Sequence, residues 1–509
     1  MSSWSFNSVK PITSYFGANN SFTSCNLPGL CVAKINFISA IFMNKSTRII
    51  RLLGPVVAII FAAWGQFESE FWLLGVAVWM LLWWMTETVN LAVTALLPLL
   101  MFPLLSIADA KSMGAFYAHP LVYLFFGGFV LALALEKTAL HYRIALWILN
   151  KTGTQDYGLL AGFMISTGFM SMWISNTATS IMMLPIATSV LAVLPKKKSA
   201  SLSRPILLSI AWSANIGGMA TLIGTPPNLI FAGFLSERLD REIGFVEWLP
   251  IGLTATFILG ITAFFVLRRG LSDSELSEEQ EYQTSIWLKE EWTKLGPLNV
   301  EQKKVGIIFV STAVLWIVRP YLGQVFTELN WTDTGISLMA ALLLFSVGTG
   351  SKKALLDWSD TTKLPWGILL LFGGGLALAG TLQDSTWFDQ LSTSLQSFGD
   401  VSLLFWLIVM AVLGVFATEL LSNMALVSAL LPLVLTISIA FGFSMELISI
   451  PLVLGASCAF MLPMATPPNA IVFSTGKLTI PYMVSRGIVM NVISVIVLVL
   501  MGYVMSLMA

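Results

Sequence analysis

Long apolar stretches alternate with short polar ones along most of the chain. A helix that crosses a bilayer needs about 20 mainly apolar residues, and eleven stretches qualify, alone or with a break in them. They lie near 52–66, 71–86, 89–106, 120–136, 205–235, 248–268, 305–320, 331–348, 365–382, 447–475 and 488–508. The pattern predicts an all-α polytopic membrane protein of about eleven transmembrane helices, embedded in a lipid bilayer.

Two further apolar regions, 158–194 and 401–440, each carry a polar pair near the middle, Ser175-Asn176 and Ser422-Asn423. Two half-length helices that meet at such a pair would form a re-entrant hairpin. A membrane tolerates the tip of a hairpin only where protein or water surrounds it. We therefore expect two re-entrant helical hairpins in addition to the spans.

Positive charges orient the chain, because Lys and Arg are enriched in cytoplasmic loops. They cluster at 45–51, 137–151, 196–204, 268–269, 303–304, 352–363 and 477–486. Eleven spans that start inside place nearly all of these clusters in the cytoplasm. This predicts a multi-pass protein of the inner (plasma) membrane, with the N-terminus cytoplasmic and the C-terminus outside. The first hairpin then enters from the cytoplasm and the second from outside.

The hairpin pairs belong to a larger set of repeated motifs. The stretch 124–134 resembles 370–379, and Thr225-Pro226-Pro227-Asn228 recurs as Thr466-Pro467-Pro468-Asn469. Three motifs in the same order, in halves of opposite orientation, indicate an inverted repeat. Secondary transporters use this architecture and place their binding site at the midplane between the halves.

A polar segment precedes each hairpin and has one apolar face. Leu140, Ile144, Trp147 and Ile148 share a face in the first segment, and Phe388, Leu391, Leu395 and Phe398 share one in the second. This spacing predicts two amphipathic helices that lie along the membrane interface. They are either arms that join a fixed scaffold to a moving unit or ordinary interfacial helices.

Composition removes most other classes of protein. Of the 509 residues 56% are hydrophobic and only 11% are charged, whereas soluble domains carry about a quarter charged residues. Lys and Arg total 27, as do Asp and Glu, so no basic face for nucleic acid is expected. The three cysteines have no metal-site spacing and are too few for a disulfide framework. Residues 1–43 are mixed in polarity, and we expect a disordered or mis-annotated extension there.

The Ser-Asn pairs carry chemistry that suits both anions and cations. Ser, Thr and Asn cap helix N-termini, so the second arm of each hairpin should begin there and direct its free N–H groups to the midplane, where they attract anions. Hydroxyl groups lie four residues before each motif serine, at Ser171 and Thr418. Their oxygens and the Asn carbonyls are hard ligands for sodium. The alternative is that these residues only join helices by hydrogen bonds.

The Thr-Pro-Pro-Asn motifs should interrupt their helices, because two consecutive prolines remove two N–H donors. The break frees backbone carbonyls near Gly224 and Ala465, where small side chains let an ion approach. A simple kink is the alternative. Glu419, next to Thr418, is either a buried hydrogen-bonded group or a proton or cation site.

The segments expected to line the site contain no fixed cation. No Lys or Arg occurs in 152–195, 205–237 or 364–476. An anion there would lose its hydration at a cost of several kcal/mol unless cations arrived with it, and co-transported sodium ions would meet this need. An intramembrane hydrolase that uses a motif serine would lack a nearby His, Lys or Asp to act as base, so we do not expect an enzyme.

The complete motif set resembles that of the divalent anion/sodium symporter family of dicarboxylate, citrate and sulfate transporters. The resemblance covers about residues 45–509 and rests on the two Ser-Asn pairs, Thr177, and the Gly224- and Ala465-preceded Thr-Pro-Pro-Asn motifs. It implies a homodimer that moves its substrate by an elevator motion. The second Ser-Asn pair departs from the family pattern, because Met424 stands where Thr is frequent.

The resemblance also implies ligand residues. Na+ ions would be held near Ser171, Ser175, Asn176 and Gly224, and near Thr418, Leu421, Asn423 and Ala465. Substrate carboxylates would meet Ser175, Asn176, Thr177, Ser422, Asn423 and Thr466. The expected parts are scaffold at 44–150 and 305–400, transport unit at 151–269 and 401–509, and a cytoplasmic loop at 270–304.

The function that we expect is sodium-coupled symport of a small dicarboxylate anion, such as the C4-dicarboxylate succinate, by alternating access. Two alternatives use the same fold. One is a sodium-independent dicarboxylate exchanger, and the other is a transporter of sulfate or citrate.

Overall fold

A computed structural model describes residues 49–194, 196–239, 241–269, 271, 278–349, 353–397, 399 and 401–508. Arg51–Ala509 form one compact unit. Helices make up this unit, and in its described part the β-structure is one isolated bridge between Gly348 and Ala354. The expected extension at 1–43 and Phe398 of the second amphipathic helix lie outside the described residues.

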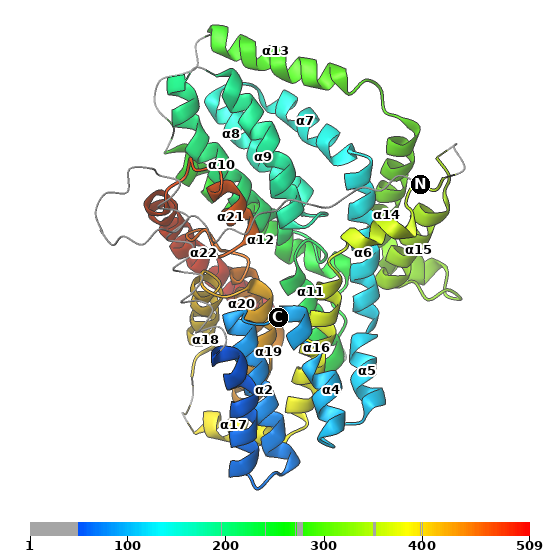
Figure 1. Cartoon of the computed structure of the whole chain (residues 1–509), viewed down its shortest axis with the longest axis vertical. Coiled ribbons are helices and arrows are strands. Elements are labelled where there is room, and N and C mark those ends of the chain that lie inside the picture. The colour runs from blue at the N-terminus through cyan, green and yellow to red at the C-terminus, as the bar shows by residue number, and fades with distance from the viewer. Residues whose placement is uncertain are drawn as a thin grey trace, which may run out of the picture. The chain divides into compact units, whose positions relative to one another are not determined.

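Apolar helices form where the sequence predicts spans (Figure 1). Eight described helices are long and apolar enough to cross a membrane. The first group of helices, in chain order, is Ile49–Trp64, α2 (Ser69–Thr86), α3 (Leu91–Thr94), α4 (Leu97–Leu104), α5 (Ala110–Tyr117) and α6 (Pro120–Lys137). Later members are α12 (Phe245–Arg268), α14 (Val300–Val325), α15 (Asp333–Ser346), α16 (Trp366–Gln383) and α22 (Ile480–Met508). The prediction of an all-helical membrane protein is confirmed.

Both expected hairpins are present. The first consists of α8 (Asp156–Ser171) and α9 (Asn176–Val193). The second consists of α18 (Leu403–Val412), a π-helical turn at Leu413–Ala417, and α19 (Asn423–Phe441). In each hairpin the motif serine has a non-helical backbone and immediately precedes the second arm, so the chain turns at the Ser-Asn pair.

The helices that carry Thr-Pro-Pro-Asn are broken as expected, in segments that contain Gly224 and Ala465. Helix α10 (Lys196–Gly218) is followed by α11 (Pro226–Leu239), and α20 (Met445–Gly455) by α21 (Pro467–Phe473). The prolines therefore start the second half of each helix and do not end the first. Proline suits a first helical turn, because its missing N–H would have no partner there.

The two halves interlock. The first arm of each hairpin packs on the long helix of its own half, α8 on α10 and α18 on α20. The short helices cross over, since α11 packs on α19 and α21 packs on α9. Each hairpin is therefore held by helices of both halves, and this brings the two tips to one region.

An amphipathic helix lies before each hairpin, α7 (Leu140–Thr152) against α8 and α17 (Thr386–Gln396) against α19. Leu140 and Ile148 of α7 are buried, whereas Trp147 is 53% exposed. The segment predicted as a loop, 270–304, contains helix α13 (Glu278–Lys294), which packs on α7. Arg143 of α7 fixes the end of this helix, because its guanidinium donates to the carbonyl oxygens of Leu295 and Gly296 at 2.8 Å.

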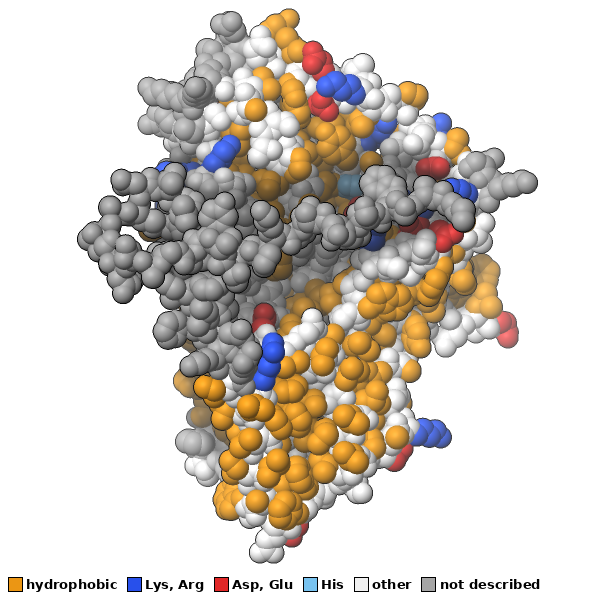
Figure 2. Space-filling model, viewed as in Figure 1, with side chains coloured by type: hydrophobic (Ala, Val, Ile, Leu, Met, Phe, Trp, Pro, Cys, Tyr) orange, Lys and Arg blue, Asp and Glu red, His pale blue; other side chains and the backbone are white. Residues whose placement is uncertain are grey.

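Hydrophobic side chains cover much of the outer surface over α2, α4 and α5, as Figure 2 shows for one face. Leu100 and Leu104 of α4 are 62% and 69% exposed. An apolar surface of this extent is expected where lipid, and not water, surrounds the helices.

Close glycine contacts join each first arm to its long helix. A Cβ atom on Gly217 of α10 would lie 2.2 Å from the carbonyl oxygen of Gly168 on α8, and one on Gly414 would lie 2.7 Å from that of Leu452. Backbones that approach this closely leave room only for hydrogen at the Cα position.

We expect Gly217→Ala to lower the thermal unfolding midpoint of the detergent-solubilised protein, because overpacking of this kind costs about 1–3 kcal/mol. Gly260→Ala is the matched control, since a Cβ on Gly260 of α12 would meet no atom within 4 Å. The control should leave the midpoint unchanged or raise it slightly, because alanine favours the helix. Equal midpoints for Gly217→Ala and the wild type would contradict the close contact.

Candidate functional site

The hydroxyl expected near the first hairpin tip bridges the tip to α10. Ser171 Oγ lies 2.7 Å from Asn176 Oδ1 and 2.7 Å from the carbonyl oxygen of Ala214. A hydroxyl has one hydrogen, so it can donate fully to only one of these two oxygens at a time. Three oxygen atoms thus converge on one proton, in a place where Ser171 is fully buried.

The second tip repeats this arrangement atom for atom. Thr418 Oγ1 lies 2.8 Å from Asn423 Oδ1 and 2.7 Å from the carbonyl oxygen of Ala456, at the end of α20. Thr418 is also fully buried. Hydroxyl, amide and carbonyl oxygens are hard, neutral donors of the kind that alkali and alkaline-earth cations prefer. Each tip therefore offers a cluster of donors that fits a sodium ion.

The asparagines of the Thr-Pro-Pro-Asn motifs hold the broken segments in shape. Asn228 Nδ2 donates to the carbonyl of Thr221 at 2.9 Å, and Asn469 Nδ2 donates to that of Leu462 at 3.0 Å. In both halves the acceptor lies seven residues before the asparagine. Carbonyls in a broken helix have lost their helical partners, and the amide replaces part of that loss.

The hairpin tips and the broken helices surround one cavity of about 700 Å³. From the two repeats it is lined by Ser175, Asn176, Thr177, Gly224, Thr225, Leu421, Ser422, Asn423, Met424, Ala465 and Thr466. On the opposite side it is lined by Met85, Thr86, Glu87, Leu91, Gly128, Phe129 and Ile368, from α2, α3, α6, α16 and the α2–α3 loop. None of the described residues that line it is a lysine or an arginine.

All six residues expected to bind substrate line this cavity together. Of the residues expected to bind sodium, Ser175, Asn176, Gly224, Leu421, Asn423 and Ala465 line it as well. Ser171 and Thr418 are placed one layer behind, each bonded to the asparagine of its tip. The structure thus brings the whole predicted set to one place.

The two tips differ in their capping. Ser175 Oγ accepts a hydrogen bond from the backbone N–H of Ala178 at 3.3 Å, as an N-cap side chain does. Ser422 occupies the same position before α19, but its side chain makes no such bond. The Ser422 hydroxyl is therefore free to turn toward the cavity.

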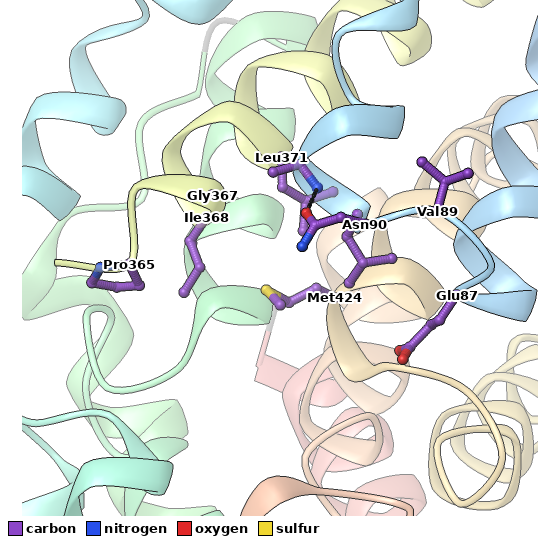
Figure 3. Close-up of a pocket in the computed structure, with 10 residues that line it drawn as sticks. Glu87, Val89, Asn90, Pro365, Gly367, Ile368, Leu371 and Met424 are labelled. Atoms are coloured by element: carbon purple, nitrogen blue, oxygen red, sulfur yellow. Dashed lines mark hydrogen bonds between the residues drawn. The ribbon is translucent and has the colours of Figure 1, made fainter. Parts of the chain in front are cut away.

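Met424 forms part of the wall of the cavity. It also lines a neighbouring cavity of about 380 Å³ between the α2–α3 loop and the start of α16 (Figure 3). In this view its thioether lies between Ile368 and Glu87, with the sulfur on the side of Ile368. The two cavities share Glu87, Leu91, Ile368 and Met424, so Met424 stands at their common boundary.

Glu87 and Asn215 are among the cavity residues that the sequence analysis missed. Glu87 is the carboxylate among the described lining residues, and it ends α2 with a left-handed backbone, φ 47°. Asn215 is fully buried, and its Nδ2 donates to the Ala459 carbonyl at 3.1 Å and to Thr466 Oγ1 at 3.2 Å. The lone asparagine in the apolar stretch 205–218 was the available signal for Asn215.

Comparison with known proteins agrees with this geometry. A family model described as the sodium:sulfate symporter transmembrane region matches residues 46–509. The chain belongs to this symporter family. The resemblance drawn from the motifs is confirmed, and the family consists of transporters and not of enzymes.

The symporter chain also resembles individual proteins over most of its length. The sodium-dependent dicarboxylate transporter SdcS of Staphylococcus saprophyticus is 34% identical over 480 residues, 90% of this chain and 92% of that protein. SdcS of Staphylococcus aureus strain NCTC 8325 is 35% identical over 469 residues, 89% of this chain and 90% of that protein. The solved structure of Neisseria gonorrhoeae MtrF, from a class of antimetabolite efflux pumps, has a TM-score of 0.51 at 14% identity. The match covers 78% of this chain and 84% of MtrF, and at this identity it shows only that the two proteins share a fold.

The unequal caps of the symporter lead to a stability prediction. Ser175→Ala should destabilise the start of α9 by about 1 kcal/mol, the typical contribution of an N-cap side chain. Ser422→Ala should change the start of α19 much less, because it removes no cap bond. Hydrogen exchange of the amides at 176–180 and 423–427, without sodium or substrate, measures both effects. Equal increases in exchange at the two tips would contradict the assignment.

Proposed function

We propose that this protein is a secondary active transporter that carries a small divalent anion inward together with sodium. The observation that carries the proposal is the pair of matching oxygen clusters, at Ser171 and Thr418, on the two tips that meet at one cavity. A C4-dicarboxylate such as succinate is the favoured substrate, because SdcS relatives of two species are named sodium-dependent dicarboxylate transporters.

Each cation is assigned to one tip. The first is held by Ser171, Ser175, Asn176 and Gly224, and the second by Thr418, Leu421, Asn423 and Ala465. In each cluster one hydroxyl hydrogen lies between two acceptor oxygens. A sodium ion would satisfy the lone pairs that a single proton leaves without a partner.

The substrate carboxylates are assigned to the N-terminal ends of α9 and α19. Free N–H groups and the helix dipole attract negative charge there, and Ser175, Asn176, Thr177, Ser422 and Asn423 add polar groups. Thr466, the N-cap of α21, lines the same cavity. Since Asn215 donates to Thr466 Oγ1 at 3.2 Å, the hydroxyl hydrogen of Thr466 remains available for a carboxylate.

Charge balance makes the cations necessary. The described lining contains Glu87 and neither lysine nor arginine, so a dianion has no fixed partner of opposite charge. Entry of two negative charges against a potential of −100 mV costs ~4.6 kcal/mol at ~2.3 kcal/mol per charge. With more than two sodium ions per dianion, each cycle carries net positive charge inward. The membrane potential then favours entry and no longer opposes it.

The movement that we propose is alternating access of elevator type. Residues 44–150 and 305–400 form the scaffold, and residues 151–269 and 401–509 form the transport unit. The central cavity supports this division, because one side is lined from each part. Helices α7 and α17 are the arms between the parts. The protein lies in the inner (plasma) membrane as a homodimer, with its N-terminus cytoplasmic and its C-terminus outside.

Uptake of labelled succinate into proteoliposomes tests the proposal. We expect uptake only with an inward sodium gradient, and faster uptake as the interior is made more negative, since net positive charge enters. Asn176→Ala is the inactive control. It removes Oδ1, which is a proposed sodium ligand and also bonds to Ser171 at the hairpin tip. Inhibition of succinate uptake by excess unlabelled sulfate or citrate measures the preference among these substrates.

Two outcomes would overturn the proposal. Uptake that continues when choline replaces sodium would exclude sodium coupling. Succinate counterflow in sodium-free proteoliposomes, at the rate seen with sodium, would identify the protein as an exchanger.

We expect the two carboxylate sites to differ, because Met424 stands in the second where Thr177 stands in the first. Thr177 can donate a hydrogen bond to a carboxylate, whereas a thioether only accepts one weakly. We expect Met424→Thr to lower the apparent KM for succinate at saturating sodium by a few-fold or more, since a hydrogen bond to a charged group contributes ~1.5–3 kcal/mol. Leu91→Ala, another residue on the shared wall of the two cavities, is the control for a change of cavity volume without a new donor. A Met424→Thr variant with unchanged KM and unchanged substrate preference would place Met424 outside the binding site.

A further inference from the structure

Glu419 is a buried carboxylate beside the second cation cluster. It follows Thr418 directly in the chain and is 3% exposed. Four N–H groups donate to it, at 2.8–2.9 Å, from the backbones of Phe460, Met461 and Leu462 and from the side chain of Asn491. A carboxylate only accepts hydrogen bonds, so this ring of donors matches its charged form.

The three backbone donors belong to the segment that separates α20 from α21. Other side chains bond to the carbonyl oxygens of the same segment. Asn469 Nδ2 donates to Ala459 and Leu462, at 3.1 and 3.0 Å, and Thr418 Oγ1 lies 2.7 Å from the oxygen of Ala456. Glu419 therefore fixes the N–H side of a segment whose carbonyl side contributes to the cation cluster.

The position of the first half that corresponds to Glu419 carries no charge. Met172 follows Ser171 in the chain, as Glu419 follows Thr418, and its backbone carbonyl accepts a bond from the Thr221 hydroxyl. The N–H groups of Met219 and Ala220, which correspond to Phe460 and Met461, are bonded within their own turn to Ile216 and Gly217. The equivalent contact is thus neutral in the first half and charged in the second.

We propose that Glu419 is a positioning residue that makes the sodium site of the second hairpin the tighter of the two, so that it fills first as sodium rises. This inference rests on the proposed sodium coupling. A fixed negative charge close to one cluster lowers the free energy of a cation there, and the four groups that bond to Glu419 are neutral amides. The four donors hold the charge and the segment in one geometry before the ion arrives.

Sodium binding to the purified protein tests the inference without transport. The thermal unfolding midpoint is measured against sodium chloride, with choline chloride keeping the ionic strength constant. We expect Glu419→Gln to raise the half-saturating sodium concentration by about tenfold or more, because it removes the charge and turns an amide donor toward N–H groups. Met172→Gln, at the equivalent position of the first half, is the matched control and should leave that concentration within about twofold of the wild type.

Two further measurements distinguish this role of the Glu419 charge from a role in which the side chain only maintains the shape of the hairpin tip. At saturating sodium, Glu419→Gln should recover succinate uptake with a KM close to that of the wild type, which a distorted tip would not allow. Glu419→Asp keeps the charge with a shorter reach, so its half-saturating sodium should remain within about threefold of the wild type. This variant also decides the matter if Glu419→Gln yields no folded protein.

The outcomes distinguish this inference from the proposed function. A sodium-dependent midpoint that is the same in wild type and Glu419→Gln would overturn the role of Glu419 and leave sodium coupling intact. A tenfold loss in Glu419→Asp, equal to that in Glu419→Gln, would likewise overturn it. A wild-type midpoint that does not respond to sodium would overturn both.

Discussion

Backbone that is not helical inside a bilayer needs partners for its N–H and C=O groups, and the whole central region is organised by this requirement. Lipid supplies none, and each unsatisfied group costs several kcal/mol. The chain leaves helical geometry at four places here, two hairpin tips and two broken helices. Ser171 and Thr418 engage carbonyls of the adjacent long helices. Asn228 and Asn469 engage carbonyls of their own broken segments. The hydroxyl groups of Ser171 and Thr418 thus bond to the backbone and also belong to the oxygen clusters of the two tips.

The inverted repeat is exact in some contacts and broken in others. The bonds made by Ser171 and Thr418 are equivalent, as are those of Asn228 and Asn469. The differences lie at the next residue in the chain. Met172 follows Ser171 where Glu419 follows Thr418, and Thr177 follows Asn176 where Met424 follows Asn423. A symmetric frame with unequal neighbours allows two sites of similar geometry to differ in affinity. Such a difference gives a transporter a defined order of binding, which two identical sites would lack.

Burial and charge explain why neutral groups dominate the cavity. A lysine or arginine placed there would attract the proposed dianion but would also repel the proposed sodium ions. Neutral oxygens and helix N-termini bind ions of both signs with less bias. The membrane-facing helices are apolar for a different reason, since their outer surface meets lipid. Polar chemistry is therefore confined to the interior, where the two repeats meet.

The sequence by itself determined the class of fold, the two hairpins, the repeated motifs and the residues of the hairpin tips and Thr-Pro-Pro-Asn motifs that line one side of the cavity. These depend on local properties: the length of apolar runs, the capping preference of Ser175 and Ser422, and the inability of proline to continue a helix. The helix breaks near Gly224 and Ala465 also have a local cause, because Pro226 and Pro467 favour helix starts.

Only the tertiary structure decided which groups of distant segments meet. Asn215 reaches Thr466 across 251 positions, and Glu419 takes the amides of residues 460–462 that lie 41 to 43 positions away. The end of helix α13, which lies in an expected loop, is bonded to Arg143 of α7, 152 and 153 positions earlier. No periodicity in the sequence specifies such pairs, since a hydrogen bond depends on the distance between atoms after the helices have packed.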